Sequence, residues 1–145
     1  MIAIDANLLL YAYDAAAPEH DRARAWLEAT FSASPVVGLP LISVLAFLRI
    51  TTDRRLSAAA HTPERAAEIV GSWLQRENVS ILEPGTRHWP IFFATLSDAG
   101  ATGPRISDVH LAALAIEHGA TFYTNDRDFR VFPQLEVRFP LRDEM

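Results

Sequence analysis

The stretch GATFYTNDRDF, residues 119–129, contains one complete strand together with the turns on either side of it. Gly119 suits the left-handed position that follows the end of a helix, and the aromatic and β-branched residues of 120–124 favour a strand. Asp126 and Asp128 come directly after that strand. Because ligands of open α/β sheets gather at the carboxyl ends of strands, this stretch predicts acidic groups at a functional edge.

Two more acids are predicted to lie at the same edge. Asp5 ends the strand-like residues 2–5, and Asp108 opens the helical stretch 107–118. Each acid alone has a structural explanation: Asp5 as a helix N-cap, Asp108 as a first-turn acid, and Asp126 as a turn residue. Those explanations do not account for three acids at one edge. We therefore expect the three carboxylates to converge on one hard cation.

Strands and helices alternate along the chain, which predicts an α/β fold with a parallel sheet of about five strands flanked by helices. A length of 145 residues without a repeat or a linker fits one domain over residues 1–145. Strands are expected at residues 2–5, 35–39, 79–82, 120–124 and 136–139, and helices at about 7–16, 19–32, 41–53, 63–77, 86–99 and 107–118.

Two other features are interpreted as structural. His110 is expected to be a polar residue near a helix start rather than a ligand. An apolar stripe at helical spacing favours core packing over a dimer or partner surface, and it consists of Trp89, Phe92, Phe93 and Leu96.

The composition excludes several classes of protein. There is no cysteine, so neither a disulfide nor a thiolate metal site is available. All 13 basic residues are arginine, and the missing lysine excludes an ordinary P-loop and Schiff-base chemistry. A net charge of −5 argues against broad nucleic-acid binding but allows a local basic rim. A strand that begins at residue 2 and the lack of a long apolar run lead us to expect a soluble, cytoplasmic protein.

Three blocks of the sequence resemble the PIN domain, and specifically the VapC toxin family of toxin–antitoxin ribonucleases. They are IDANLL at residues 4–9, SVLAFLRI at 43–50, and the pair SD at 107–108 together with TNDRDF at 124–129. The likeness spans almost the whole chain, and its last block is the most specific. It implies a PIN-like fold, a metal-dependent endoribonuclease that cleaves single-stranded RNA loops, a homodimer, and a VapB-like antitoxin as partner.

The resemblance also implies roles for individual residues. Asp5, Asp108 and Asp126 would bind Mg²⁺ or Mn²⁺ and form the catalytic centre, with Asn7 and Asp128 supporting them from outside. A bound cation lowers the pKa of a water and neutralises charge that gathers on the phosphate. Candidate contacts to RNA phosphates, each with surface solubility as the alternative, are Arg49, Arg105, Arg127 and Arg130.

Residue 46 departs from the family pattern. VapC proteins have a glutamate there, in a Glu-Phe-Leu-Arg sequence, whereas this chain has Ala46 followed by Phe-Leu-Arg. Asp53 lies ~10 Å further along the expected helix, at ~1.5 Å per residue, and cannot replace the missing carboxylate. The catalytic position is therefore expected to be impaired, by natural decay or by a deliberate substitution that makes a toxic protein harmless. Because the other blocks match the family pattern, a deliberate substitution is favoured over natural decay.

Two functions remain open at this point. The first is a metal-dependent endoribonuclease toxin that is impaired at residue 46 and held inactive by its antitoxin. The alternative is a non-catalytic module with the PIN fold that binds an antitoxin or RNA. A different metal-dependent phosphoesterase is a weaker third option.

Overall fold

The chain folds around one sheet of five parallel strands, in the order β3-β2-β1-β4-β5. The structure is a computed structural model that describes residues 1–57 and 60–142. Its strands are β1 (Ile2–Ile4), β2 (Val37–Pro40), β3 (Val79–Leu82), β4 (Thr121–Tyr123) and β5 (Val137–Arg138). The predicted α/β class and the parallel sheet of five strands are confirmed.

The order of the strands reverses next to β1. From β1 the sheet adds β2 and then β3 on one side, whereas β4 and β5 lie on the other side. Ile2 of β1 pairs with Val37 of β2 and also with Thr121 of β4. The carboxyl ends of β1 and β4 therefore flank the point of reversal, which is where open α/β sheets form a ligand crevice.

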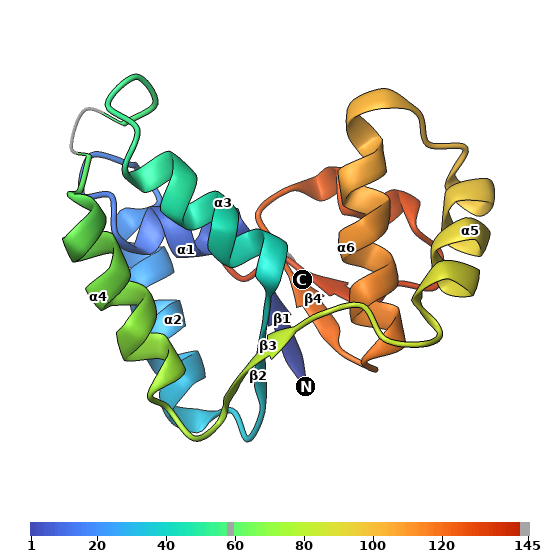
Figure 1. Ribbon diagram of the computed structural model, residues 1–145, viewed down its shortest axis with the longest axis horizontal. Helices are drawn as coiled ribbons and strands as arrows, with labels where there is room; N and C mark the ends of the chain where they lie inside the picture. Colours follow the sequence, from blue (N-terminus) through green and yellow to red (C-terminus); the bar gives the residue numbers. More distant parts are fainter. Residues whose placement is uncertain (58–59, 143–145) are drawn as a thin grey trace.

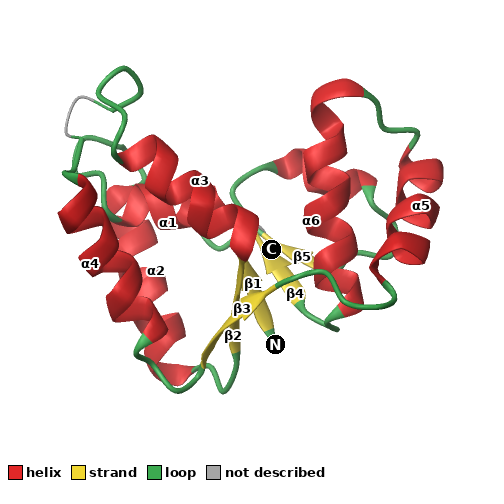
Figure 2. Ribbon diagram, viewed as in Figure 1, coloured by secondary structure: helices red, strands yellow, loops and turns green. Residues whose placement is uncertain are grey.

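Helices cover both faces of the sheet. They are α1 (Ala6–Ala12), α2 (His20–Ala33), α3 (Leu41–Thr51), α4 (Pro63–Leu74), α5 (His88–Ala99) and α6 (Ile106–Glu117), with the short 3-10 helices η1 (Gly103–Arg105) and η2 (Arg127–Val131). Helices α1 to α4 lie on one side of the sheet, and α5 and α6 lie on the other (Figures 1 and 2). In the part of the chain that the structure describes, every helix is too short or too polar to cross a membrane.

The ends of the helices follow local signals. Gly119 takes a left-handed backbone conformation after α6, as predicted, and Gly100 takes one after α5. Thr62 caps α4, where its side chain accepts the amide of Arg65. Helix α1 ends at residue 12 instead of 16, because the Asp14 carboxylate accepts the amide of Ala16 and closes a turn. The 3-10 helices η1 and η2 were not predicted.

Each face of the sheet has its own hydrophobic core. Side chains alternate along a strand, so Ala3 belongs to the core under α6 while Ile4 belongs to the core under α1 to α4. Within α6, Val109 and Ala112 are fully buried, as expected for a helix pressed against a sheet. The largest buried side chains in the two cores are Phe47, Trp73, Phe122 and Phe129.

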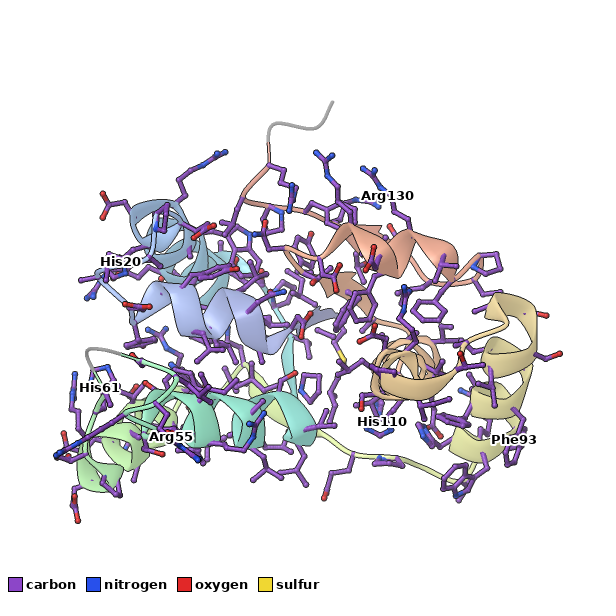
Figure 3. All side chains as sticks on the ribbon, turned by 90° about the horizontal axis from the view of Figure 1, so that it is seen from above. His20, Arg55, His61, Phe93, His110 and Arg130 are labelled. Atoms are coloured by element: carbon purple, nitrogen blue, oxygen red, sulfur yellow. The ribbon has the colours of Figure 1, made fainter. Side chains whose placement is uncertain are left out.

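The apolar stripe on α5 is only half buried. Phe92 and Leu96 pack against the core beneath the helix, whereas Trp89 and Phe93 are each 60% exposed. The rings of Trp89 and Phe93 stack with their centroids 5.7 Å apart, and Phe93 lies on the outer side of α5 (Figure 3). The core interpretation is therefore wrong for these two residues, because α5 packs on α6 through its other side.

Two glycines offer a matched test of packing. A β-carbon added to Gly38 of β2 would lie 2.6 Å from Cδ1 of the buried Leu82, whereas one added to Gly71 of α4 meets nothing within 4 Å. We expect Gly38→Ala to lower the free energy of unfolding by ~1–3 kcal/mol through overpacking. Gly71→Ala should raise it by ~0.5–1 kcal/mol, because alanine favours a helix more than glycine does. Urea titrations measure both changes, and an unchanged Gly38→Ala protein would contradict the close contact.

Candidate metal centre

Asp5 stands at the point where the strand order reverses. It follows β1 and caps α1, where its Oδ1 accepts the amide of Ala6 at 2.8 Å. Its Oδ2 accepts the hydroxyl of Thr124, which follows β4, at 2.7 Å. One carboxylate thus joins the ends of the two strands that flank the crevice.

Thr124 and Asn7 complete a hydrogen-bonded network around Asp5. Thr124 is fully buried. Its Oγ1 accepts hydrogen bonds from the side-chain amide of Asn7 at 3.2 Å and from the backbone amide of Asp126 at 3.0 Å. The Oδ1 of Asn7 accepts the backbone amide of Asn125 at 3.2 Å. Thr124 was missed as a site residue, although a hydroxyl between acids at a strand end is a signal that the sequence contains.

Asp126 and Asp128 take different positions on the same turn. Asp126 caps η2, where its Oδ1 accepts the amide of Asp128 at 2.9 Å. Its charge is close enough to raise the pKa of Asp5. The side chain of Asp128 is 69% exposed and reaches toward Arg105. Asp126 therefore belongs to the acidic centre, and Asp128 lies at its rim.

Asp108 enters the centre from the first turn of α6, with Arg105 beside it. Nε of Arg105 lies 3.3 Å from Oδ2 of Asp108, and Nη1 lies 3.7 Å from Oδ2 of Asp128. Nη2 of Arg105 also donates to the backbone carbonyl of Asp128 at 3.0 Å. Arg105 is thus the counter-ion of two acids, and its predicted contact with an RNA phosphate stays a prediction.

Asp5, Asp108 and Asp126 are close enough together for their charges to influence the pKa values of Asp5 and Asp108. Burial raises the pKa of Asp5 to about 6, and the charges of Asp108 and Asp126 act in the same direction, while the hydrogen bonds from Thr124 and Ala6 oppose the rise. Burial also raises the pKa of Asp108, with Arg105 lowering it and Asp126 adding to the rise. A divalent cation would relieve this repulsion, and an all-carboxylate donor set suits Mg²⁺ or Mn²⁺.

The side chains that the structure describes do not form a complete coordination site for a metal ion. Within residues 1–57 and 60–142, no three acidic or histidine side chains are placed to hold one metal ion. Binding would require the carboxylates of Asp5, Asp108 and Asp126 to turn toward one another. The cation that these three residues share therefore stays a prediction.

Residue 46 lies on α3, which starts at the carboxyl end of β2. Ala46 is half-buried, and Arg49 is exposed in the last turn of the helix. Asp53 lies beyond the helix and pairs with Arg55 at 3.0 Å, so it is engaged elsewhere, as expected from its distance along the chain. Ser43, one turn before Ala46, is only 2% exposed, and its hydroxyl has no hydrogen-bond partner in the described chain.

The other residues singled out from the sequence lie around the centre. Arg127 and Arg130 are exposed on η2, and the Arg130 guanidinium lies 4.8 Å from the centroid of the Phe139 ring (Figure 3). His110 contacts His88, with 3.3 Å between Nδ1 of His110 and Nε2 of His88. Burial, together with His88, lowers the pKa of His110. This imidazole is therefore engaged with a second histidine between α5 and α6.

The strand order β3-β2-β1-β4-β5, with acids at its point of reversal, places the chain among α/β proteins of the Rossmann-like strand order. The PIN domain family model matches residues 2–135. Ribonuclease VapC33 of Mycobacterium tuberculosis strain H37Rv is 38% identical over 143 residues, which cover 99% of this chain and 100% of that protein. The chain belongs to the PIN-domain family, on its VapC branch, and the resemblance seen in the sequence is confirmed.

Solved structures show the same fold at lower identity. Mycobacterium tuberculosis VapC20, described as a Sarcin-Ricin loop cleaving toxin, matches with a TM-score of 0.69 and 19% identity over 95% of this chain and 99% of that chain. VapBC2 from Rickettsia felis, bound to a DNA fragment from their promoter, matches with a TM-score of 0.68 and 19% identity over 95% of this chain and 98% of that chain.

The raised pKa of Asp5 predicts a pH-dependent stability. The pKa of the carboxyl rises from its ordinary value of 3.8 to about 6 on folding, so the folded protein holds more protons between these values. The free energy of unfolding should therefore fall as the pH rises through this range, and the contribution is lost above it. Asp5→Asn should flatten this part of the profile. Urea titrations in EDTA at several pH values measure the difference.

Added Mg²⁺ provides the complementary measurement. At neutral pH it should raise the unfolding temperature of the unmodified chain, because the cation binds the folded state and relieves the repulsion. It should leave Asp5→Asn nearly unchanged. Equal stabilisation of both proteins would place the cation away from Asp5.

Proposed function

We propose that the chain is a metal-dependent endoribonuclease toxin of a toxin–antitoxin pair, with activity lowered by Ala46. The observation that carries this proposal is the grouping of Asp5, Asp108 and Asp126 at the strand reversal, where burial, and to a smaller extent the charges of the other two acids, raise the pKa of Asp5. Support comes from VapC33, a relative that matches 99% of this chain and is named a ribonuclease.

The residues of the chain would hold Mg²⁺ or Mn²⁺ through Asp5, Asp108 and Asp126. When bound, the cation supplies a water of lowered pKa and neutralises charge on the phosphate. Asp5 is oriented by hydrogen bonds from Ala6 and Thr124 and by a longer one, 3.4 Å, from the Asn7 side chain, and Oδ1 keeps a lone pair for a ligand. The Asn7 side chain holds Asn125 in place beside Asp126. These contacts fix the positions of the acids before substrate arrives.

Arg105 would offset the repulsion that RNA meets at this centre. Its guanidinium lies between Asp108 and Asp128 and is partly exposed. A phosphate that approaches the acids can accept a charge-assisted hydrogen bond from the same group. Arg105 would therefore serve as a counter-ion before binding and as a phosphate contact during the reaction.

Ala46 removes the fourth carboxylate of the family pattern, and the buried Ser43 hydroxyl supports this interpretation. Ser43 precedes Ala46 by one helical turn, the spacing at which side chains on a helix meet. A glutamate at residue 46 would give that hydroxyl an acceptor, which it lacks in the described chain. Loss of the carboxylate would weaken cation binding and remove a group that orients the water.

Restoring the carboxylate tests the function directly. Ala46→Glu should raise Mg²⁺- or Mn²⁺-dependent cleavage of a mixture of structured RNAs by at least ~10-fold, and adding Asp5→Ala should remove ~100-fold or more. Gel analysis of the unmodified chain and both variants, with and without EDTA, measures the rates. If Ala46→Glu cuts no better than the unmodified chain, residue 46 is not a catalytic position. If no variant cuts RNA, the non-catalytic binding module becomes the function.

We further propose a homodimer that binds a short VapB-like antitoxin. The related VapBC2 structure contains both components of such a pair by its description. An arginine from an antitoxin tail would suit the acidic crevice electrostatically. The stacked and exposed rings of Trp89 and Phe93 provide an apolar surface for the dimer contact.

Light scattering on a sizing column tests the dimer. The double variant Trp89→Ala/Phe93→Ala should shift the protein toward monomer, whereas Leu74→Ala, which removes another exposed apolar side chain from α4, should not. A chain that is monomeric before any substitution would contradict the dimer. Failure to purify a complex with the product of the adjacent small gene would contradict the antitoxin.

A further inference from the structure

A cavity of about 570 Å³ lies beside the loop that carries Asp126, outside the acidic centre. It is formed where β4 and β5 end and the chain continues toward its last described residue. This volume lies in the range of small-ligand pockets. The polar and aromatic side chains that line the cavity are Tyr123, Arg130, Arg138, Phe139 and Arg142.

The cavity is strongly cationic in a chain of net charge −5. Three of its lining residues are arginines, from η2, from β5 and from the segment after β5. One acid offsets them locally, since Glu136 pairs with Arg138 at 2.9 Å. Arginine presents a planar fork of donors that matches a phosphate. The charge therefore favours an anionic ligand.

Aromatic rings supply the second part of the site. The guanidinium of Arg130 lies over the Phe139 ring at 4.8 Å from its centroid. Tyr123 stacks on Trp26 of α2, with 5.4 Å between the ring centroids, and this contact fixes the tyrosine ring at the cavity wall. Aromatic rings and guanidinium planes are the surfaces on which unpaired bases of RNA stack. Arginine and aromatic groups together suit a nucleotide better than a simple anion.

The cavity is tied to the acidic centre by two connections. Arg142 donates from Nε and Nη2 to the backbone carbonyl of Asn125, at 3.3 and 2.9 Å, directly before Asp126. Helix η2 starts after Asp126 and carries Arg130, which places the arginine ~8 Å along the axis at ~2.0 Å per residue. A strand of RNA with its scissile phosphate at the acids would therefore reach this cavity with a neighbouring nucleotide.

We propose that this cavity binds one nucleotide of single-stranded RNA next to the cleaved bond, with its phosphate on Arg130 and Arg138 and its base against Phe139 and Tyr123. The proposal rests on RNA as the substrate class of the proposed function. Arg142 is a positioning residue, because its guanidinium holds the loop before Asp126.

A matched pair of double variants tests the site. Arg130→Ala/Arg138→Ala removes two arginines of the cavity, and Arg24→Ala/Arg65→Ala removes two ion-paired arginines from α2 and α4. Both double variants remove two positive charges. Arg138, Arg24 and Arg65 have side chains that are 57%, 58% and 56% exposed, and each of these three is paired with a glutamate. The probe is a fluorescein-labelled single-stranded RNA of ten mixed nucleotides. Fluorescence anisotropy in EDTA measures binding by the unmodified chain and by both variants.

The cavity variant should bind the probe at least ~10-fold more weakly than the control variant at low salt. Its slope of log affinity against log salt should fall by about 0.7, since both arginines contact the same phosphate and one lost phosphate on a single strand removes about 0.7. Phe139→Leu should weaken binding several-fold without changing the slope, because it removes a stacking surface and no charge. Unchanged unfolding temperatures establish that the variants are folded.

Equal weakening by both double variants, or an unchanged salt slope, would overturn the proposal. Loss of antitoxin binding with RNA binding intact would also overturn it, since the cavity would then hold an acidic segment of a protein. The cavity proposal and the nuclease proposal can fail independently of each other. If Ala46→Glu cuts RNA while the cavity variant binds RNA normally, only the cavity proposal is wrong. If nothing cuts RNA while the cavity variant alone loses RNA binding, the cavity is an RNA-binding site, but the nuclease proposal and the placement next to a cleaved bond are wrong.

Discussion

The hydrogen bond from Thr124 to Asp5 is the contact on which the crevice depends. It joins residues 119 positions apart, at the ends of two strands that each contain three residues. The backbone amide of Asp5 adds a bond to the carbonyl of Tyr123 at 2.9 Å. Strands this short form few backbone hydrogen bonds with each other. The side-chain contact therefore helps to fix the relative position of the carboxyl ends of β1 and β4. Asp126 follows the same end of β4, whereas Asp108 enters the centre from the first turn of α6.

This arrangement carries an electrostatic cost. Burial opposes ionisation of Asp5, and two further carboxylates increase the opposition, so its pKa rises even with two hydrogen bonds in its favour. A fold selected for stability alone would replace these acids with apolar or neutral side chains. Repulsion that a divalent cation can relieve is characteristic of a site kept for binding.

The sequence predicted the sheet and the three acids because both are local signals. Asp5, Asp108 and Asp126 each adjoin an element with a clear hydrophobic pattern, and parallel strands bring their carboxyl ends to one edge. Thr124 could not be assigned a role in the same way, since its partner lies at the other end of the chain. Helical spacing showed that Trp89 and Phe93 share a face, but spacing does not reveal whether anything covers that face.

Arginines hold the loop after β4 from two directions. Arg105 donates to the carbonyl of Asp128, and Arg142 donates to the carbonyl of Asn125, so the backbone on both sides of Asp126 is bound by guanidinium groups. Arginine stays charged across the pH range in which carboxylates titrate. The contact from Arg142 to the carbonyl of Asn125 involves no carboxylate, so it does not change with protonation at the acidic centre. The carboxylates can gain a proton, exchange it for a cation or meet a phosphate while this contact holds the backbone directly before Asp126.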